Sequence, residues 1–136
     1  MFKRYALNGM LIQSDCHAFE DEKFDFVINV SECQNPHDNL VVYYPDLVPI
    51  DPRDLLKVAR IVEGLVKQGK RVVIHCSAGV HRSVTFSLAS IMYIKRIGIR
   101  EAMEELKEPK INFVQYLLEI PFHYISLLFF EKFFLS

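Results

Sequence analysis

Near the middle of the chain the sequence reads Val72-Val73-Ile74-His75-Cys76-Ser77-Ala78-Gly79-Val80-His81-Arg82-Ser83. The β-branched run predicts a buried strand and the residues after Arg82 predict a helix, so the loop between them lies at a helix N-terminus. Unsatisfied N–H groups and the helix dipole make such a loop a site for a phosphate-sized anion, and the same field favours the thiolate form of a cysteine. Arg82 adds a permanently charged fork for phosphate oxygens, and Gly79 permits the backbone angles that turn amides inward. The stretch therefore predicts a nucleophilic Cys76 beside a bound phosphate.

The motif His75-Cys76-x5-Arg82-Ser83 resembles the phosphate-binding signature of cysteine-based protein phosphatases. The residues from Cys76 to Ser83 are most similar to those of the dual-specificity branch. This resemblance implies that Cys76 is the nucleophile and that the Ser83 hydroxyl stabilises the departing thiolate. It implies a phosphate-binding loop made of Ser77, Ala78, Gly79, Val80, His81 and Arg82. For two side chains, two interpretations remain open. His75 either orients Cys76 or fills the core, and His81 either contacts the substrate or is exposed to solvent.

The length of 136 residues indicates one domain over residues 1–136, and a hydrophobic fraction of 51% argues against disorder. A formal net charge of -1 gives no reason to expect nucleic acid or an anionic membrane as partner. Three cysteines without framework spacing (Cys16, Cys33 and Cys76) predict reduced thiols and a cytoplasmic protein. The N-terminus does not resemble a signal peptide, and no uncharged apolar run is long enough to span a membrane.

Local patterns along the chain predict an α/β fold. Asn8-Gly9 between two apolar triplets predicts a hairpin with a two-residue turn. Further strands are expected over residues 24–30, 40–44 and 72–75, and helices over residues 52–68, 83–96, 99–107 and 113–120. Because strand, helix and strand in this order require a crossover, we expect three layers: a central, mainly parallel sheet of four or five strands with helices on both faces.

Residues 122–136 form an apolar tail rich in phenylalanine, beyond the part that resembles the phosphatases, about residues 5–122. We expect this tail to be a helix that packs on the domain. A contact with a second copy of the chain or with a partner is the second interpretation, and contact with a membrane is the third.

Hydrolysis through a cysteine also needs an acid that protonates the leaving oxygen. The sequence Tyr44-Pro45-Asp46-Leu47-Val48-Pro49 resembles the Pro-Asp-x-x-x-Pro motif of the general-acid loop in related small phosphatases, but it has one residue fewer before the second proline. Asp51 already has a structural role as the cap of the helix that begins at Pro52. We therefore expect Asp46 to be the general acid, with Asp51 as the alternative.

The resemblance implies an enzyme that hydrolyses phosphotyrosine, and phosphoserine and phosphothreonine as well, in a phosphoprotein substrate without metal or cofactor. Two alternatives stay open: a rhodanese-type sulfurtransferase and a non-catalytic phosphate-binding module. The absence of lysine from residues 77–81 disfavours phosphoinositides.

The cysteines other than Cys76 allow two further readings. Either Cys16 or Cys33 could form a protective disulfide with oxidised Cys76, as the resemblance implies. A zinc site could use Cys33-x3-His37 with His75-Cys76, although it would leave Arg82 unexplained.

Overall fold

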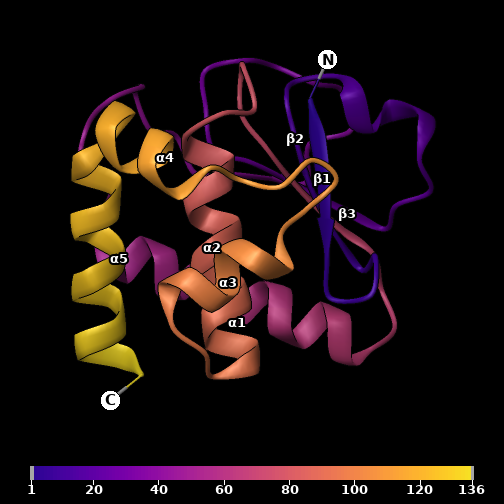
Figure 1. Ribbon diagram of the computed structural model, residues 1–136. Coiled ribbons are helices and arrows are strands. Elements are labelled where there is room, and N and C mark those ends of the chain that lie inside the picture. Colours follow the sequence, from indigo (N-terminus) through magenta and orange to yellow (C-terminus); the bar gives the residue numbers. More distant parts are fainter. Residues whose placement is uncertain (1, 136) are drawn as a thin grey trace.

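The computed structural model describes residues 2–135. At its centre lies one five-stranded sheet (Figure 1). The strands are β1 (Lys3–Ala6), β2 (Leu11–Ser14), β3 (Phe26–Asn29), β4 (Leu40–Val41) and β5 (Val72–His75). They lie in the order β1-β2-β5-β3-β4. β1 pairs antiparallel with β2, whereas the β2–β5, β5–β3 and β3–β4 pairings are parallel. The expected mainly parallel sheet is therefore confirmed, and β5 is its central strand.

The described residues form one 3-10 helix and five α-helices. They are η1 (a 3-10 helix, Ala18–Asp21), α1 (Pro52–Lys67), α2 (Arg82–Lys95), α3 (Ile99–Glu105), α4 (Phe113–Glu119) and α5 (Pro121–Phe134). α1 begins as predicted: Pro52 is its first residue, and the Asp51 side chain accepts a hydrogen bond from the Arg53 amide at 2.9 Å. Figure 1 shows α2 in the centre of the helical layer and α5 on the side remote from β1.

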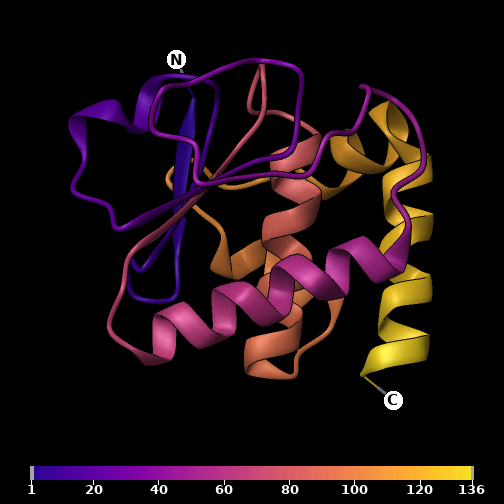
Figure 2. The ribbon, with the colours of Figure 1, turned by 180° about the vertical axis from the view of Figure 1, so that it is seen from behind.

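The two faces of the sheet bury two unequal cores. Val72 and Ile74 belong to the large core with α1, α2, α3 and α5, and α1 crosses the foreground of Figure 2. Val73 points the other way, into a small cluster that also contains Phe19 of η1. The alternation follows from the period of two in a strand. The sequence predicted helices on both faces of the sheet. The face that carries Val73 is covered by the short helix η1, so this layer is thinner than predicted.

Two strand ends differ from the prediction. The hairpin closes with Ala6 opposite Leu11, and positive φ begins at Leu7 (55°) and continues through Asn8 (56°) and Gly9 (80°). The two-residue turn expected at Asn8-Gly9 is thus wrong: the loop is longer and starts one residue earlier. β4 ends at Val41 rather than at Tyr44, because the Tyr44 carbonyl accepts a hydrogen bond from Arg82 instead of pairing in the sheet.

The apolar tail forms α5 and packs on α1 and α2 through buried Leu127 and Phe130. Its other face leaves large apolar side chains exposed, namely Phe122, Ile125, Leu128, Phe129 and Phe133. Among the described residues no single helix has the length and apolarity needed to cross a membrane. α4 and α5 meet that test only together, and a bend of 106° separates them.

Candidate active site

The loop between β5 and α2 holds the predicted nucleophile beneath the surface. Cys76 is 2% exposed, and its Sγ atom lies 3.1 Å from the hydroxyl oxygen of Ser83 in the first turn of α2. Ser83 Oγ also lies 3.2 Å from the carbonyl oxygen of Ser14. The structure thus brings together a thiol and a hydroxyl that the sequence separates by six residues.

Gly79 gives this loop its shape. Its φ of +76° falls in the left-handed region, and a Cβ atom there would lie 2.7 Å from the backbone nitrogen of Asp15. Glycine is therefore required both by the backbone angle and by the close approach of another chain segment.

Gln13 of β2 holds the loop from the side, and the sequence analysis missed it. Its Nε2 group donates to the carbonyl of Gly79 and lies within hydrogen-bonding distance of Ser83 Oγ, both at 2.8 Å. Arg4 supports Gln13 in turn through a 3.0 Å bond from Nη1 to Oε1. No local sequence pattern identifies Gln13 as a residue that supports the loop. It does so because the strand register places it opposite Ile74 of β5.

Arg82 is buried, at 3% exposure, and carries the charge that an anion would meet. Its Nη1 group donates to Glu32 Oε2 at 2.5 Å and to the Tyr44 carbonyl at 2.7 Å. Arg82 holds the pKa of the Glu32 carboxyl below its usual value. Among the described residues the buried Nε group has no hydrogen-bond partner. Because an unsatisfied buried donor is costly, this group favours an incoming anion.

Asp46 lies next to the loop between β5 and α2, whereas Asp51 lies at the N-terminus of α1. Asp46 Oδ1 is 3.8 Å from Arg82 Nε and 3.7 Å from His81 Nδ1. A cavity of about 10 Å³ beneath it is lined by Asp46, Cys76, Ala78, Val80, His81 and Arg82. This volume suffices for about one water molecule, so the cavity is narrow in this structure. Asp51 caps α1 and pairs with Arg53 at 2.7 Å.

His81 has a hydrogen-bonding partner at one ring nitrogen, whereas its Nδ1 atom, 3.7 Å from Asp46 Oδ1, makes no hydrogen bond among the described residues. Besides Asp46, it faces Glu119 of α4, with 3.2 Å between Nε2 and Oε1.

His123 of α5 anchors the segment that carries Asp46. Its Nε2–H donates to the Val48 carbonyl at 3.0 Å, and Nδ1 lies 2.9 Å from Thr85 Oγ1 of α2. Burial lowers the pKa of His123 to about 4, so its ring is neutral near pH 7. α5 therefore fixes the position of the segment that carries Asp46.

His75 is fully buried behind Cys76. Nε2 lies 2.6 Å from Asp38 Oδ1, Nδ1 lies 3.5 Å from Cys33 Sγ, and the ring stacks on Phe19. The zinc site suggested by Cys33-x3-His37 does not form, because His37 packs edge-on against Phe24 instead.

The cysteines contradict one expectation. Cys16 and Cys33 are joined in a disulfide with their Cα atoms 6.3 Å apart, and Cys76 is the free cysteine. The prediction of three reduced thiols is therefore wrong for two of them. Spacing could not reveal this pair, because it joins the segments that follow β2 and β3, the two strands on either side of β5.

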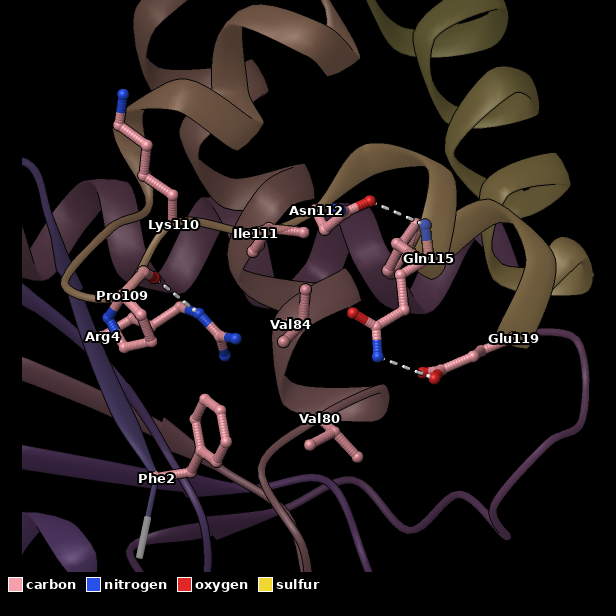
Figure 3. Close-up of a pocket in the computed structure, with 11 residues that line it drawn as sticks. Phe2, Arg4, Val80, Val84, Pro109, Lys110, Ile111, Asn112, Gln115 and Glu119 are labelled. Carbon is pink, nitrogen blue, oxygen red and sulfur yellow. Dashed lines mark hydrogen bonds between the residues drawn. The ribbon is translucent and has the colours of Figure 1, made fainter.

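A second cavity of about 240 Å³ adjoins the loop (Figure 3). Val80 lines this cavity and the smaller one beside Cys76. Arg4, Ile111 and Gln115 contribute further walls. Gln115 donates to Glu119 Oε2 at 3.0 Å within this second cavity. It is thus not among the residues that line the cavity above Cys76.

The sequence matches a known family over most of its length. The family model described as the dual specificity phosphatase catalytic domain matches residues 11–120. A probable tyrosine-protein phosphatase of Candida albicans (strain WO-1) is 32% identical over 100 residues, which cover 62% of this chain and 16% of that protein. Dual specificity protein phosphatase 2 of Homo sapiens is 28% identical over 107 residues, covering 68% and 33% respectively. The chain thus spans only a small part of the length of these two curated relatives.

Solved structures share the fold. The crystal structure of Tk-PTP in the active form superposes with a TM-score of 0.63 at 28% identity, covering 81% of this chain and 80% of that one. Human DUSP28 superposes with a TM-score of 0.69 at 19% identity, covering 90% and 88%. The second likeness concerns the fold alone.

Proposed function

Because this chain belongs to the dual specificity phosphatase catalytic-domain family, we propose that it hydrolyses phosphate monoesters through a covalent intermediate on Cys76. The observation that carries the proposal is the 3.1 Å contact between Cys76 Sγ and Ser83 Oγ, in a loop that also places buried Arg82. A sulfurtransferase would use the thiol and the anion site, but it would have no use for an acid placed like Asp46.

In the first step the Cys76 thiolate attacks phosphorus, the S–P bond forms and the ester P–O bond breaks. Asp46 donates its proton to the leaving oxygen. Arg82 and the amides of residues 77–82 stabilise the charge on the transferring phosphoryl group. The Nε group of Arg82 supports this role, because among the described residues this buried donor makes no hydrogen bond and could donate one to a phosphate oxygen.

In the second step water replaces the thiolate. Asp46, now ionised, accepts a proton from the water, the new O–P bond forms and the S–P bond breaks. Inorganic phosphate leaves and the thiolate returns to Cys76. Ser83 stabilises that thiolate through its hydroxyl group, a role supported by the distance to Sγ.

The substrate we propose is phosphotyrosine in a phosphoprotein, with phosphoserine and phosphothreonine as further substrates. The family supports this class. The position of the cavity supports it as well: Asp46, which lines it, has a side chain that is 50% exposed, so the site opens near the surface. Phosphotyrosine, phosphoserine and phosphothreonine peptides of one sequence compared by kcat/KM would rank the three residues.

A first test measures p-nitrophenyl phosphate hydrolysis in the presence of EDTA, between about pH 4 and pH 8. Wild type should turn over, and Cys76→Ser should not, although it should still bind phosphate. Asp46→Ala should lower kcat by at least about tenfold, within the usual contribution of a general acid. Asp51→Ala is the matched control. Turnover by Cys76→Ser would remove Cys76 as nucleophile, and a loss confined to Asp51→Ala would transfer the acid role to Asp51.

Partners beyond the substrate, and the location of the protein in the cell, stay predictions. The exposed apolar face of α5, with Phe129 and Phe133 stacked at 5.8 Å, supports a contact with a second copy or a partner. A cytoplasmic location was expected from reduced thiols, and the Cys16–Cys33 disulfide weakens that reasoning.

A further inference from the structure

Three metal-ligating side chains meet behind the catalytic loop, outside the machinery described above. They are Cys16, Cys33 and His75, and their ligating atoms all lie within 4.8 Å of one another. We propose that, once a thiol has reduced the Cys16–Cys33 disulfide, the two sulfurs and the Nδ1 atom of His75 bind one Zn²⁺ ion. This site is distinct from catalysis, which uses the sulfur of Cys76.

The fold brings the three ligands to one point. His75 ends β5 and lies in register with Ser14 of β2 on one side and Asn29 of β3 on the other. Cys16 and Cys33 follow these two neighbouring strands within a few residues. The Cys16 amide is held on the Ser77 carbonyl at 3.2 Å. Three adjacent parallel strands end here, so the sheet holds His75 directly and brings the segments that carry Cys16 and Cys33 close to it.

The ligand geometry suits zinc. Zn–S and Zn–N bonds of about 2.3 and 2.0–2.1 Å place tetrahedral ligand atoms roughly 3.3–3.8 Å apart. His75 Nδ1 already lies 3.5 Å from Cys33 Sγ. The sulfurs have to separate when the disulfide is reduced, which rotations about their side-chain bonds provide. Three protein ligands leave the fourth position to water, and sulfur with imidazole is a donor set that zinc prefers.

A neighbouring carboxylate orients His75 in the way that metal-binding histidines require. Nε2 lies 2.6 Å from Asp38 Oδ1, and because a carboxylate only accepts, Nε2 carries the proton and Nδ1 presents its lone pair in the neutral ring. Asp38 Oδ2 is itself fixed by Asn29 Nδ2 at 2.9 Å and by the Asn35 amide at 3.2 Å. The outer shell of the site is therefore already in place.

The chemistry balances with a thiol as reductant. Two molecules of thiol reduce the Cys16–Cys33 disulfide to two cysteine thiols and leave as their own disulfide. Zn²⁺ then displaces one proton from each thiol and bonds to both thiolates and to the neutral imidazole. Oxidation of the pair removes both sulfur ligands, so the disulfide and the zinc-bound form exclude each other.

The test uses the full chain carrying Cys76→Ser, so that the active-site thiolate cannot bind the metal. The protein is reduced with a phosphine, freed of reductant and metal, and titrated with Zn²⁺ against a chromophoric chelator. We expect one Zn²⁺ per chain, and a sulfur-to-metal charge-transfer band when Co²⁺ replaces it. Adding Asp38→Asn should weaken binding by about 10- to 100-fold, as second-shell changes do.

Two controls make the result decisive. Adding Cys33→Ser to the same background should abolish both the stoichiometric zinc and the cobalt band, while far-ultraviolet circular dichroism confirms that the chain is folded. The oxidised protein, with its disulfide verified by mass spectrometry, should bind no zinc until a thiol is added. If the reduced Cys76→Ser protein binds no zinc, or if Cys33→Ser leaves binding unchanged, the proposal is wrong. Neither readout depends on phosphatase activity.

Discussion

His123 joins α5 to the segment that carries Asp46, and we predict that protonating His123 destabilises the fold. In the native chain Nε2–H donates to the Val48 carbonyl at 3.0 Å, and Nδ1 lies 2.9 Å from Thr85 Oγ1. Burial lowers the pKa of His123 from 6.5 to about 4. The unfolded chain therefore takes up a proton at a higher pH than the folded chain. Consequently the free energy of unfolding decreases as the pH falls from about 6.5 toward about 4, and His123 causes no further loss below that.

The size of this effect follows from the pKa difference. About 2.5 pKa units correspond to about 3 kcal/mol, of which about 2 kcal/mol is lost by about pH 5. His123→Gln keeps a donor and an acceptor but does not titrate. Urea unfolding at about pH 7.5 and about pH 5 should show wild type losing about 2 kcal/mol more than the variant. Equal losses would refute the reasoning, because the carboxylates that titrate in this range are common to both proteins.

Three further predictions concern the catalytic loop. Glu32→Gln frees Arg82 from a carboxylate, so the inhibition constant for inorganic phosphate should fall several-fold; a rise would mean that Glu32 orients Arg82 for binding. Gly79→Ala combines a positive φ with a clash at Asp15, and thermal melting should show about 1–3 kcal/mol of destabilisation. Gln13→Ala removes the support of Ser83 and Gly79, so kcat for p-nitrophenyl phosphate should fall about tenfold, equivalent to about 1.4 kcal/mol. Unchanged melting of Gly79→Ala, or unchanged kcat of Gln13→Ala, would contradict these roles.

Local sequence was enough for most of the fold, because its signals act over a few residues. Pro52 after Asp51 marked the start of α1, and the β-branched run from Val72 marked β5. The strand after residue 40 was predicted too long, since Tyr44 leaves the sheet to bind Arg82 and Asp54. Those contacts join distant segments, and no periodicity in the strand itself records them.

The predicted site residues Cys76, Arg82 and Ser83 lie within one short stretch, and the structure places them together around the same loop. The residues that hold the loop were not predictable in this way. Gln13 reaches it because β2 pairs with β5, and Glu32 reaches Arg82 from the segment after β3. Such positions depend on register and strand order, which are decided by the whole sheet.

An anion site made of backbone amides works only if the amides already point inward before the anion arrives. In this chain Gln13 Nε2–H of β2 donates a hydrogen bond to the Gly79 carbonyl at 2.8 Å, and this bond holds the loop from outside the phosphate-binding stretch. The segment that carries Asp46, the proposed acid, has an equivalent support, because His123 Nε2–H of α5 donates a hydrogen bond to the carbonyl of Val48, two residues beyond Asp46. Both supports lie outside the phosphate-binding stretch. We therefore expect the stretch from His75 to Ser83 by itself to bind an anion weakly, because it would lack the strand and the helix that hold it and the Asp46 segment in place.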